Sequence, residues 1–163
     1  MEGRLALRTP MLPSPILTLC SANICRSPFA EHYLRHRLRQ AGAFAEVFSR
    51  GILEMEGRPV PEEGLAAARE MGVEMGRHRS CRVQAGDLDR AALVLVMEQQ
   101  HRHYLMQLRP QCVGKIFLLS QPGGGGDVPD PMGKGLEAFR DSYRVIAQHL
   151  DGWLLRFGVV QSS

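Results

Sequence analysis

Short apolar runs alternate with segments of helical periodicity along most of this chain, and this alternation restricts the possible folds strongly. The runs ILTLC and AALVLVM have the length of buried strands. Strands that alternate with helices are typical of βαβ units, in which helices cover both faces of a parallel sheet. We therefore predict a single-domain α/β fold with a four-stranded parallel sheet flanked by helices on both faces. The expected strands cover residues 16–20, 46–50, 91–97 and 113–119, and the expected helices cover 28–40, 61–71, 98–108 and 136–157.

The length and composition fit one globular domain. The chain has 163 residues, of which 44% are hydrophobic, so it can bury a core. Its net charge of +3 is small and scattered, which argues against nucleic-acid binding and mildly favours anionic substrates. The sequence shows neither a signal peptide nor an apolar run of the ~20 residues that a membrane helix needs. Residues 1–15, with three prolines, are expected to be a flexible leader to a domain over 16–158.

The cysteines favour free thiols over disulfides or zinc. Cys20, Cys25, Cys81 and Cys112 form no CxxC pair and no zinc-finger spacing with histidine. Four cysteines are too few for a disulfide-dense scaffold, so a reducing cytoplasm is the expected compartment. We expect no metal and no cofactor, and we expect Cys81 and Cys112 to be structural.

The segment LTLCSANICRSPFAE places a cysteine at the end of a strand and a proline at the start of a helix. Backbone N–H groups in such a turn can converge on an anion, and Arg26 can hold two phosphate oxygens. The helix start and Arg26 also favour the thiolate of Cys20, which makes this residue a candidate nucleophile. Ser27 can donate a hydrogen bond to the sulfur, and the amide of Asn23 can hold the loop together. The spacing Cys-x5-Arg alone is common, and its plain interpretation is a buried cysteine beside a surface arginine.

This segment resembles the signature of the low-molecular-weight protein tyrosine phosphatases. The resemblance continues through Ser49-Arg50-Gly51, LVLVME and Asp130-Pro131, and it is strongest to the bacterial branch associated with exopolysaccharide and capsule production. It implies a fold like that of phosphotyrosine protein phosphatase I and a phosphotyrosine protein as substrate, with a partner tyrosine kinase as the specific candidate. Catalysis would need no metal. The implied phosphate-binding residues are Ser21, Ala22, Asn23, Ile24, Cys25, Arg26 and Ser27.

A carboxylic acid must protonate the departing tyrosine oxygen, because a phenolate leaves poorly at neutral pH. The loop GGGGDVPDPMG offers Asp127 and Asp130. The family's acid directly precedes a proline, so the resemblance selects Asp130. Cys20 would then attack phosphorus and form a phosphocysteine, and Asp130 would next activate water. By itself, Asp-Pro is also a common turn signal.

Several further residues have two open interpretations. Cys25 is either a redox guard that forms a disulfide with oxidised Cys20 or a small buried residue that fills space. The resemblance makes His78 a brace for the loop asparagine, although the surrounding HRSCR differs from the usual pattern and a surface histidine is equally compatible. His101 and His103 lie on a polar helix and are expected to be solvated.

Two departures from the family pattern concern the substrate site. Ala22 stands where the family usually has glycine, so the loop would be strained if that position needed a glycine-only conformation. Met132 stands where an aromatic is common, and Leu53 and Met55 lie in the loop that often supplies the opposite wall. Adaptable aliphatic walls predict a wider cleft and broad substrate acceptance.

Three rival functions stay open. Arsenate reductases share this fold, but they need further cysteines, typically after the central apolar strand, where this chain reads ALVLVMEQQ. Related protein arginine phosphatases favour threonine at the position of Ile24. A phosphate-binding module with little turnover would not need Asp130.

Overall fold

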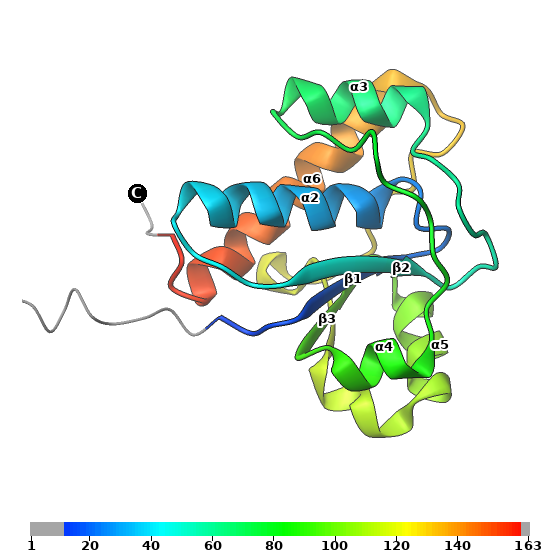
Figure 1. Cartoon of the computed structure of the whole chain (residues 1–163), viewed down its shortest axis with the longest axis vertical. Coiled ribbons are helices and arrows are strands. Elements are labelled where there is room, and N and C mark those ends of the chain that lie inside the picture. Colours follow the sequence, from blue (N-terminus) through cyan, green and yellow to red (C-terminus); the bar gives the residue numbers. More distant parts are fainter. Residues whose placement is uncertain (1–11, 161–163) are drawn as a thin grey trace, which may run out of the picture.

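The computed structural model describes residues 12–160, which form a four-stranded parallel sheet between helices (Figure 1). The strand order is β2-β1-β3-β4, with β1 paired in parallel to β2 on one side and to β3 on the other. This confirms the predicted fold class. Because β1 is central, its carboxyl end lies beside the ends of β2 and β3. The strands are β1 (Ile16–Cys20), β2 (Val47–Gly51), β3 (Leu93–Val96) and β4 (Ile116–Leu118).

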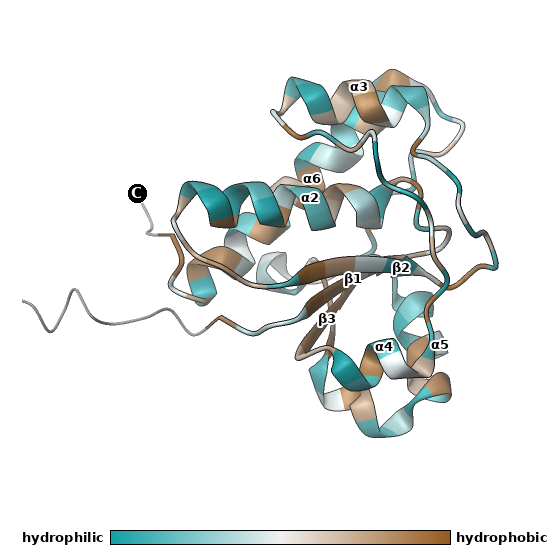
Figure 2. Ribbon diagram, viewed as in Figure 1, coloured by the Kyte–Doolittle hydropathy of each residue, from teal (hydrophilic) through white to brown (hydrophobic). Residues whose placement is uncertain are grey.

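Helices cover both faces of the sheet, and the strands between them are its most hydrophobic part (Figure 2). Alternation along β1 divides the core: Ile16 and Cys20 belong to one buried cluster, and Leu17 and Leu19 belong to the other. One layer contains α2 (Arg26–Gln40), α3 (Glu62–Glu70) and α6 (Leu136–Arg156). The opposite layer contains α4 (Ala85–Arg90), α5 (Gln99–Leu108) and the 3-10 helix η1 (Pro110–Lys115), and a short 3-10 turn η2 (Gln121–Gly123) follows β4.

The long amphipathic helix α6 matches the predicted segment and carries an aromatic cluster into the core. Phe29 of α2 stacks on Tyr143 of α6, with ring centroids 4.2 Å apart. Such a pair contributes about 0.5–1.5 kcal/mol beyond the area that it buries. The Tyr143 hydroxyl also donates to the carbonyl of Cys25 at 2.9 Å. The last helix thereby supports the loop that follows β1.

Four helices and strands differ from the sequence prediction by at least two residues, and one of them is β3, which covers Leu93–Val96 instead of 91–97. Helix α2 begins at Arg26, two residues earlier than expected, since a proline in the first turn removes no intrahelical hydrogen bond. Glu31 therefore lies beyond the first turn and is buried. Strand β4 has only three residues because η1 occupies the preceding segment. Helix α4 was not predicted, and a capping box between Gln84 and Asp87 starts it.

The predicted leader falls mostly on residues 1–11, which lie outside the described residues, so that prediction is not tested. At its end, the Ser14 hydroxyl accepts a hydrogen bond from the backbone N–H of Glu46, and the Pro15 carbonyl accepts one from Ala92. Leu12 packs against the core. No helix in residues 12–160 is long and apolar enough to cross a membrane.

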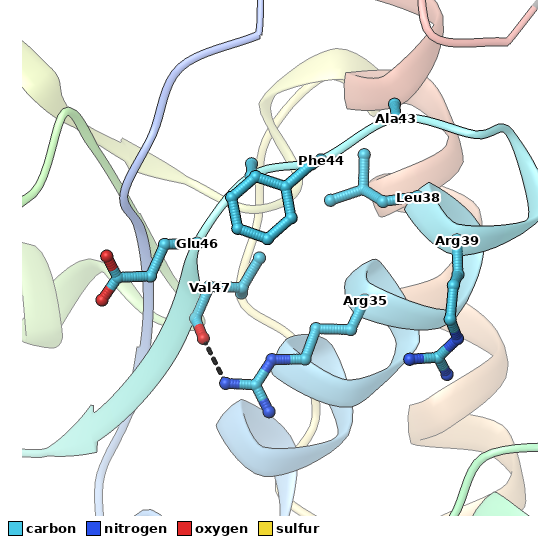
Figure 3. Close-up of a pocket in the computed structure, with 8 residues that line it drawn as sticks. Arg35, Leu38, Arg39, Ala43, Phe44, Glu46 and Val47 are labelled. Atoms are coloured by element: carbon cyan, nitrogen blue, oxygen red, sulfur yellow. Dashed lines mark hydrogen bonds between the residues drawn. The ribbon is translucent and has the colours of Figure 1, made fainter.

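A hollow of about 310 Å³ lies between the end of α2 and the start of β2 (Figure 3). Arg35 crosses it and donates to the Val47 carbonyl at 2.6 Å, which ties the helix to the strand. Phe44 on its rim is 84% exposed. The lining contains no thiol, hydroxyl or imidazole side chain, so this hollow holds none of the candidate catalytic residues.

Candidate active site

A pocket of about 260 Å³ opens at the carboxyl end of β1, where ligands bind in open α/β sheets. It is formed by the loop between β1 and α2 (residues 21–25, hereafter the phosphate loop), by the segment after β2 and by the loop before α6. The pocket therefore brings together the predicted nucleophile, arginine and acid and all three predicted wall residues. Its lining is Cys20, Ser21, Ala22, Ile24, Cys25, Arg26, Leu53, Met55, Asp130 and Met132.

The phosphate loop turns through Asn23, which has φ of +60°; no other non-glycine residue in 12–160 has a positive φ. Asparagine tolerates this conformation better than most residues. Its side-chain amide donates to Ser27 Oγ (2.8 Å) and Ser49 Oγ (2.9 Å), and its Oδ1 accepts from the Cys81 N–H (3.0 Å). Ala22 has no left-handed backbone, so the strain considered for a missing glycine does not arise there.

A glycine is instead required at Gly51, at the end of β2. A Cβ at this position would lie 2.8 Å from the carbonyl carbon of Ala22 and 2.9 Å from the backbone nitrogen of Asn23. Only a residue without a side chain allows β2 to pack this closely against the phosphate loop. The Ser49-Arg50-Gly51 motif thus supplies both a hydroxyl for Asn23 and room for the loop.

The backbone of the phosphate loop is suited to an anion. Within residues 12–160, the N–H groups of Ala22 through Cys25 donate to no other protein group. They lead directly into the first turn of α2, whose N–H groups lack intrahelical partners. Such a succession of N–H groups at a helix N-terminus attracts phosphate or sulfate.

Cys20 lies at the base of this pocket, with its Sγ 3.1 Å from Ser27 Oγ. Asn23 donates to the same hydroxyl, so the Ser27 proton can go to the sulfur or to the Arg50 carbonyl, which lies farther away at 3.4 Å. A hydroxyl donor stabilises negative charge on a thiolate. The contact is compatible with the role predicted for Ser27, which stays a prediction.

Arg26 is buried and is fixed by acceptors that sequence reasoning did not identify. Its Nη1 donates to Glu98 Oε2 at 2.6 Å and to the Val128 carbonyl at 2.8 Å, while Nη2 lies 3.8 Å from Asp130 Oδ2. Burial raises the pKa of Glu98, but hydrogen bonds from Gln100 and Arg26 outweigh it and lower the pKa overall. Glu98 is therefore a carboxylate that orients the guanidinium.

The two candidate aspartates occupy different environments. Asp130 is exposed on the rim of the pocket, and its Oδ1 accepts from the N–H of Met132 at 3.1 Å. Asp127 does not line the pocket, and its Oδ1 accepts from the N–H of Gln99 at the start of α5. Asp127 is thus a helix cap, and only Asp130 can reach a bound ligand.

His78 is enclosed rather than at the surface, with a side chain 7% exposed. Burial lowers its pKa, so the ring is neutral near pH 7, and its Nε2 lies 3.0 Å from the carbonyl oxygen of Asn23. A carbonyl only accepts, so Nε2 carries the proton. This contact is compatible with the brace that the resemblance implied for His78, which stays a prediction.

The expectation that His101 is solvated is wrong, whereas His103 is exposed as predicted. His101 Nδ1 accepts from the Glu98 N–H at 3.1 Å, which leaves the proton on Nε2 to donate to Ser21 Oγ at 2.9 Å. Burial lowers its pKa to about 4. A signal was present in the sequence: Glu98 and His101 directly follow a buried strand, at the edge where ligands bind.

Cys25 lies beside the nucleophile but in a different electrostatic setting. Burial, with the nearby charges of Cys20 and Asp130, raises its pKa to about 12, so it remains a thiol. It donates to Met132 Sδ at 3.6 Å. All four cysteines are unpaired in the structure, and the predicted disulfide between Cys20 and Cys25 stays a prediction.

This geometry agrees with the comparison with protein families. Residues 15–161 match the family model described as low molecular weight phosphotyrosine protein phosphatase. The chain belongs to this family.

Similar proteins within and around the family carry related names. The chain is 31% identical over 141 residues to the "Probable low molecular weight protein-tyrosine-phosphatase EpsP" of Ralstonia solanacearum, covering 86% of this chain and 94% of the relative. It is 32% identical over 131 residues to the "Protein-arginine-phosphatase" of Geobacillus stearothermophilus, covering 79% and 86%. The solved structure of Vibrio vulnificus Wzb in complex with benzylphosphonate superposes with a TM-score of 0.80 at 32% identity, covering 86% of this chain and 97% of that one.

Proposed function

We propose that this phosphatase hydrolyses phosphotyrosine in proteins through a phosphocysteine on Cys20. The observation that carries the proposal is a pocket lined by Cys20, Arg26 and Asp130. It adjoins the phosphate loop, whose N–H groups at residues 22–25 donate to no other group within residues 12–160. No simple binding site would need a carboxylic acid at its rim. The names of the tyrosine phosphatases among the relatives support the same substrate class.

The reaction follows from the positions of these groups. The Cys20 thiolate attacks phosphorus, and the bond from phosphorus to the tyrosine oxygen breaks while Asp130 gives its proton to that oxygen. Arg26 and the loop N–H groups stabilise the charge on the three phosphoryl oxygens. In the second step Asp130 takes a proton from water as that water attacks phosphorus, which breaks the bond to sulfur and releases phosphate. Ser27 stabilises the thiolate both before attack and on departure.

The walls of the pocket bear on the choice of substrate. Leu53 and Met132 are exposed aliphatic side chains, and Met55 lies beside them in the lining. Methionine adapts to different shapes, which supports acceptance of several phosphotyrosine sequences. We propose a bacterial tyrosine kinase of exopolysaccharide production as the physiological substrate, and four unpaired thiols support a cytoplasmic location.

The test measures phosphate release from a phosphotyrosine peptide by four proteins. Wild type is expected to hydrolyse the peptide, and Cys20→Ser is expected to be inactive. Asp130→Asn should lower kcat by about 10²–10⁴, the usual contribution of a general acid. Asp127→Asn is the matched control, because it changes an aspartate of the same loop that caps α5 instead of lining the pocket. An equal loss in both aspartate variants would refute the role of Asp130.

Phosphoarginine is the second candidate substrate, and the 32% identity to a protein-arginine-phosphatase favours its inclusion. Ile24 in the pocket lining argues for tyrosine, because an aliphatic side chain packs against a ring and offers no hydrogen bond to a guanidinium. We expect wild type to prefer a phosphotyrosine peptide over a phosphoarginine peptide, and Ile24→Thr to narrow the difference. A wild-type preference for phosphoarginine would reverse the assignment.

The remaining rivals predict other results. An arsenate reductase would consume thioredoxin thiols with arsenate, yet Cys81 and Cys112 do not line the pocket, and Cys112 donates to the Leu88 carbonyl on the other side of the sheet. A phosphate-binding module would retain phosphate without hydrolysing any peptide. Either outcome would overturn the proposed activity.

A further inference from the structure

A second cluster of reactive side chains lies behind the phosphate loop. Glu31 and His32 are neighbours on α2, and His78 belongs to the segment that joins α3 to α4. One ligand atom from each of the three lies within 4.8 Å of the other two. They line a separate cavity of about 400 Å³, which shares no residue with the catalytic pocket. The catalytic mechanism does not use His32.

Each imidazole in this cluster has a nitrogen lone pair without a hydrogen-bond donor. His78 Nε2 donates to the Asn23 carbonyl, so Nδ1 is unprotonated and lies 3.9 Å from Glu31 Oε1. His32 Nε2 lies 3.9 Å from Glu31 Oε2 and is the one buried side-chain nitrogen or oxygen in residues 12–160 with no hydrogen-bond partner. A buried polar atom without a partner is unfavourable unless something binds it. Burial lowers the pKa of both histidines, so both rings are neutral near pH 7.

We propose that Glu31, His32 and His78 bind a divalent transition metal, with Zn²⁺ as the best fit. Two neutral imidazoles and one carboxylate are a common zinc ligand set, completed by a fourth ligand from solution. Bonds of about 2.0–2.1 Å in tetrahedral geometry place ligand atoms roughly 3.4 Å apart. Each histidine lies 3.9 Å from a different oxygen of Glu31, and one ligand atom from each residue lies within 4.8 Å of the other two, so the three side chains must move closer together to reach this spacing. The hydrogen bond from His78 to a backbone carbonyl is also the contact that typically orients a metal-binding histidine.

The surrounding charges influence the fourth ligand. Arg35 pairs with Glu31 Oε2 at 2.8 Å and the Ser49 hydroxyl donates to Glu31 Oε1 at 2.6 Å, so the metal must compete with a contact at whichever carboxylate oxygen it binds. Arg77 and Arg79 also line the cavity. Their charges weaken binding of a bare dication but favour an anion such as chloride in the fourth position. We therefore expect affinity for Zn²⁺ to increase with chloride relative to a non-coordinating anion at equal ionic strength.

The site is connected to the phosphate loop through His78. A cation on Nδ1 polarises the ring and strengthens donation from Nε2 to the Asn23 carbonyl. Occupancy should therefore stabilise the segment between α3 and α4 against the loop. This inference does not depend on the proposed phosphatase activity, because its readouts are metal binding and stability.

The experiment uses the full chain with Cys20→Ser, which removes the reactive thiolate as a competing metal ligand. Calorimetric titration with Zn²⁺ should show one site, and added His32→Gln should weaken it by at least tenfold, since loss of an outer-shell contact alone costs 10–100-fold. His36→Gln is the matched control: it removes another histidine of α2 that lies outside the cluster. Zn²⁺ should raise the melting temperature of the control and not that of His32→Gln. Equal binding by His32→Gln and the control would overturn the proposal.

Cobalt spectroscopy provides a second measurement that does not require loss of binding. Co²⁺ in this site should give the visible bands of a tetrahedral nitrogen and oxygen environment without thiolate charge transfer. His32→Cys keeps a ligand in place and should add that charge-transfer band. A thiolate band before this substitution, or none after it, would place the metal elsewhere and refute the site.

Discussion

The buried imidazole of His101 makes the stability of this phosphatase dependent on pH in a way that can be calculated. The ring is fully enclosed, with one nitrogen accepting from Glu98 and the other donating to Ser21. Protonation would break the first hydrogen bond and place a charge beside Arg26. The folded protein therefore resists the proton that the unfolded chain accepts readily.

The size of the effect follows from the two pKa values. Burial lowers the pKa of His101 from 6.5 to about 4. As pH falls below 6.5 the unfolded state binds this proton first, so stability decreases with falling pH until the folded state also binds it near pH 4. Linkage gives a loss of about 2 kcal/mol from this group between about pH 7.5 and about pH 5. The full depression corresponds to roughly 3 kcal/mol.

Urea unfolding at these two pH values tests the calculation. His101→Gln keeps a donor toward Ser21 and removes the titrating ring, so its stability should fall by about 2 kcal/mol less than that of wild type over the same interval. His32 and His78 also have lowered pKa values and contribute equally to both proteins. His36→Gln serves as the control and should follow wild type. Parallel losses in wild type and His101→Gln would refute the reasoning, as would an imidazole titration by NMR with a midpoint near 6.5.

Three substitutions test other parts of the structure. Gly51→Ala adds a Cβ that would lie 2.8 Å from the Ala22 backbone, so the phosphate loop must move away. It should lower kcat/KM for peptide hydrolysis at least tenfold and lower the free energy of unfolding in urea by about 1–3 kcal/mol. Unchanged activity would contradict the close approach. Glu98→Gln leaves the buried Arg26 with only the exposed Asp130 carboxylate, 3.8 Å away, as a counter-charge. It should destabilise the fold by about 2 kcal/mol, below the 3–5 kcal/mol of a fully buried pair because Glu98 is partly exposed, and an unchanged urea midpoint would show that the pair is not needed. Leu34→Ala removes a fully buried side chain and should lower the free energy of unfolding by about 2–5 kcal/mol, while the protein that remains folded keeps its kcat. A loss of kcat without a loss of stability would contradict a purely packing role.

Several features could be predicted from the sequence because they depend on residues that are near one another in the chain. The phosphate loop is one continuous segment, so the spacing of Cys20, Arg26 and Ser27 contains most of its geometry. The helical periodicity of residues 136–157 identified α6 to within one residue. The choice of Asp130 over Asp127 came from the family resemblance, in which the acid directly precedes a proline, and agrees with its position at the pocket rim.

Other features depend on contacts between distant segments. The acceptor that fixes Arg26 is 72 residues away at Glu98, and the partner of Ser21 is 80 residues away at His101. His101 was misjudged because the polar composition of its helix was given more weight than its position shortly after a buried strand. The early start of α2 and the short β4 have a different cause: they depend on local backbone geometry, which the apolar pattern does not specify.

The sequence by itself determined the alternation of strands and helices and predicted the anion-binding loop and the reacting groups, since these depend on apolar periodicity and on residues close together in the chain. Only the tertiary structure decided which polar side chains surround that loop. The central position of β1 brings the carboxyl ends of β2 and β3 to the same edge, and there Ser49, Glu98 and His101 lose water and gain fixed partners. Burial is a property of the assembled sheet, and so are the lowered pKa of His101 and the fixed orientation of Arg26 that burial produces.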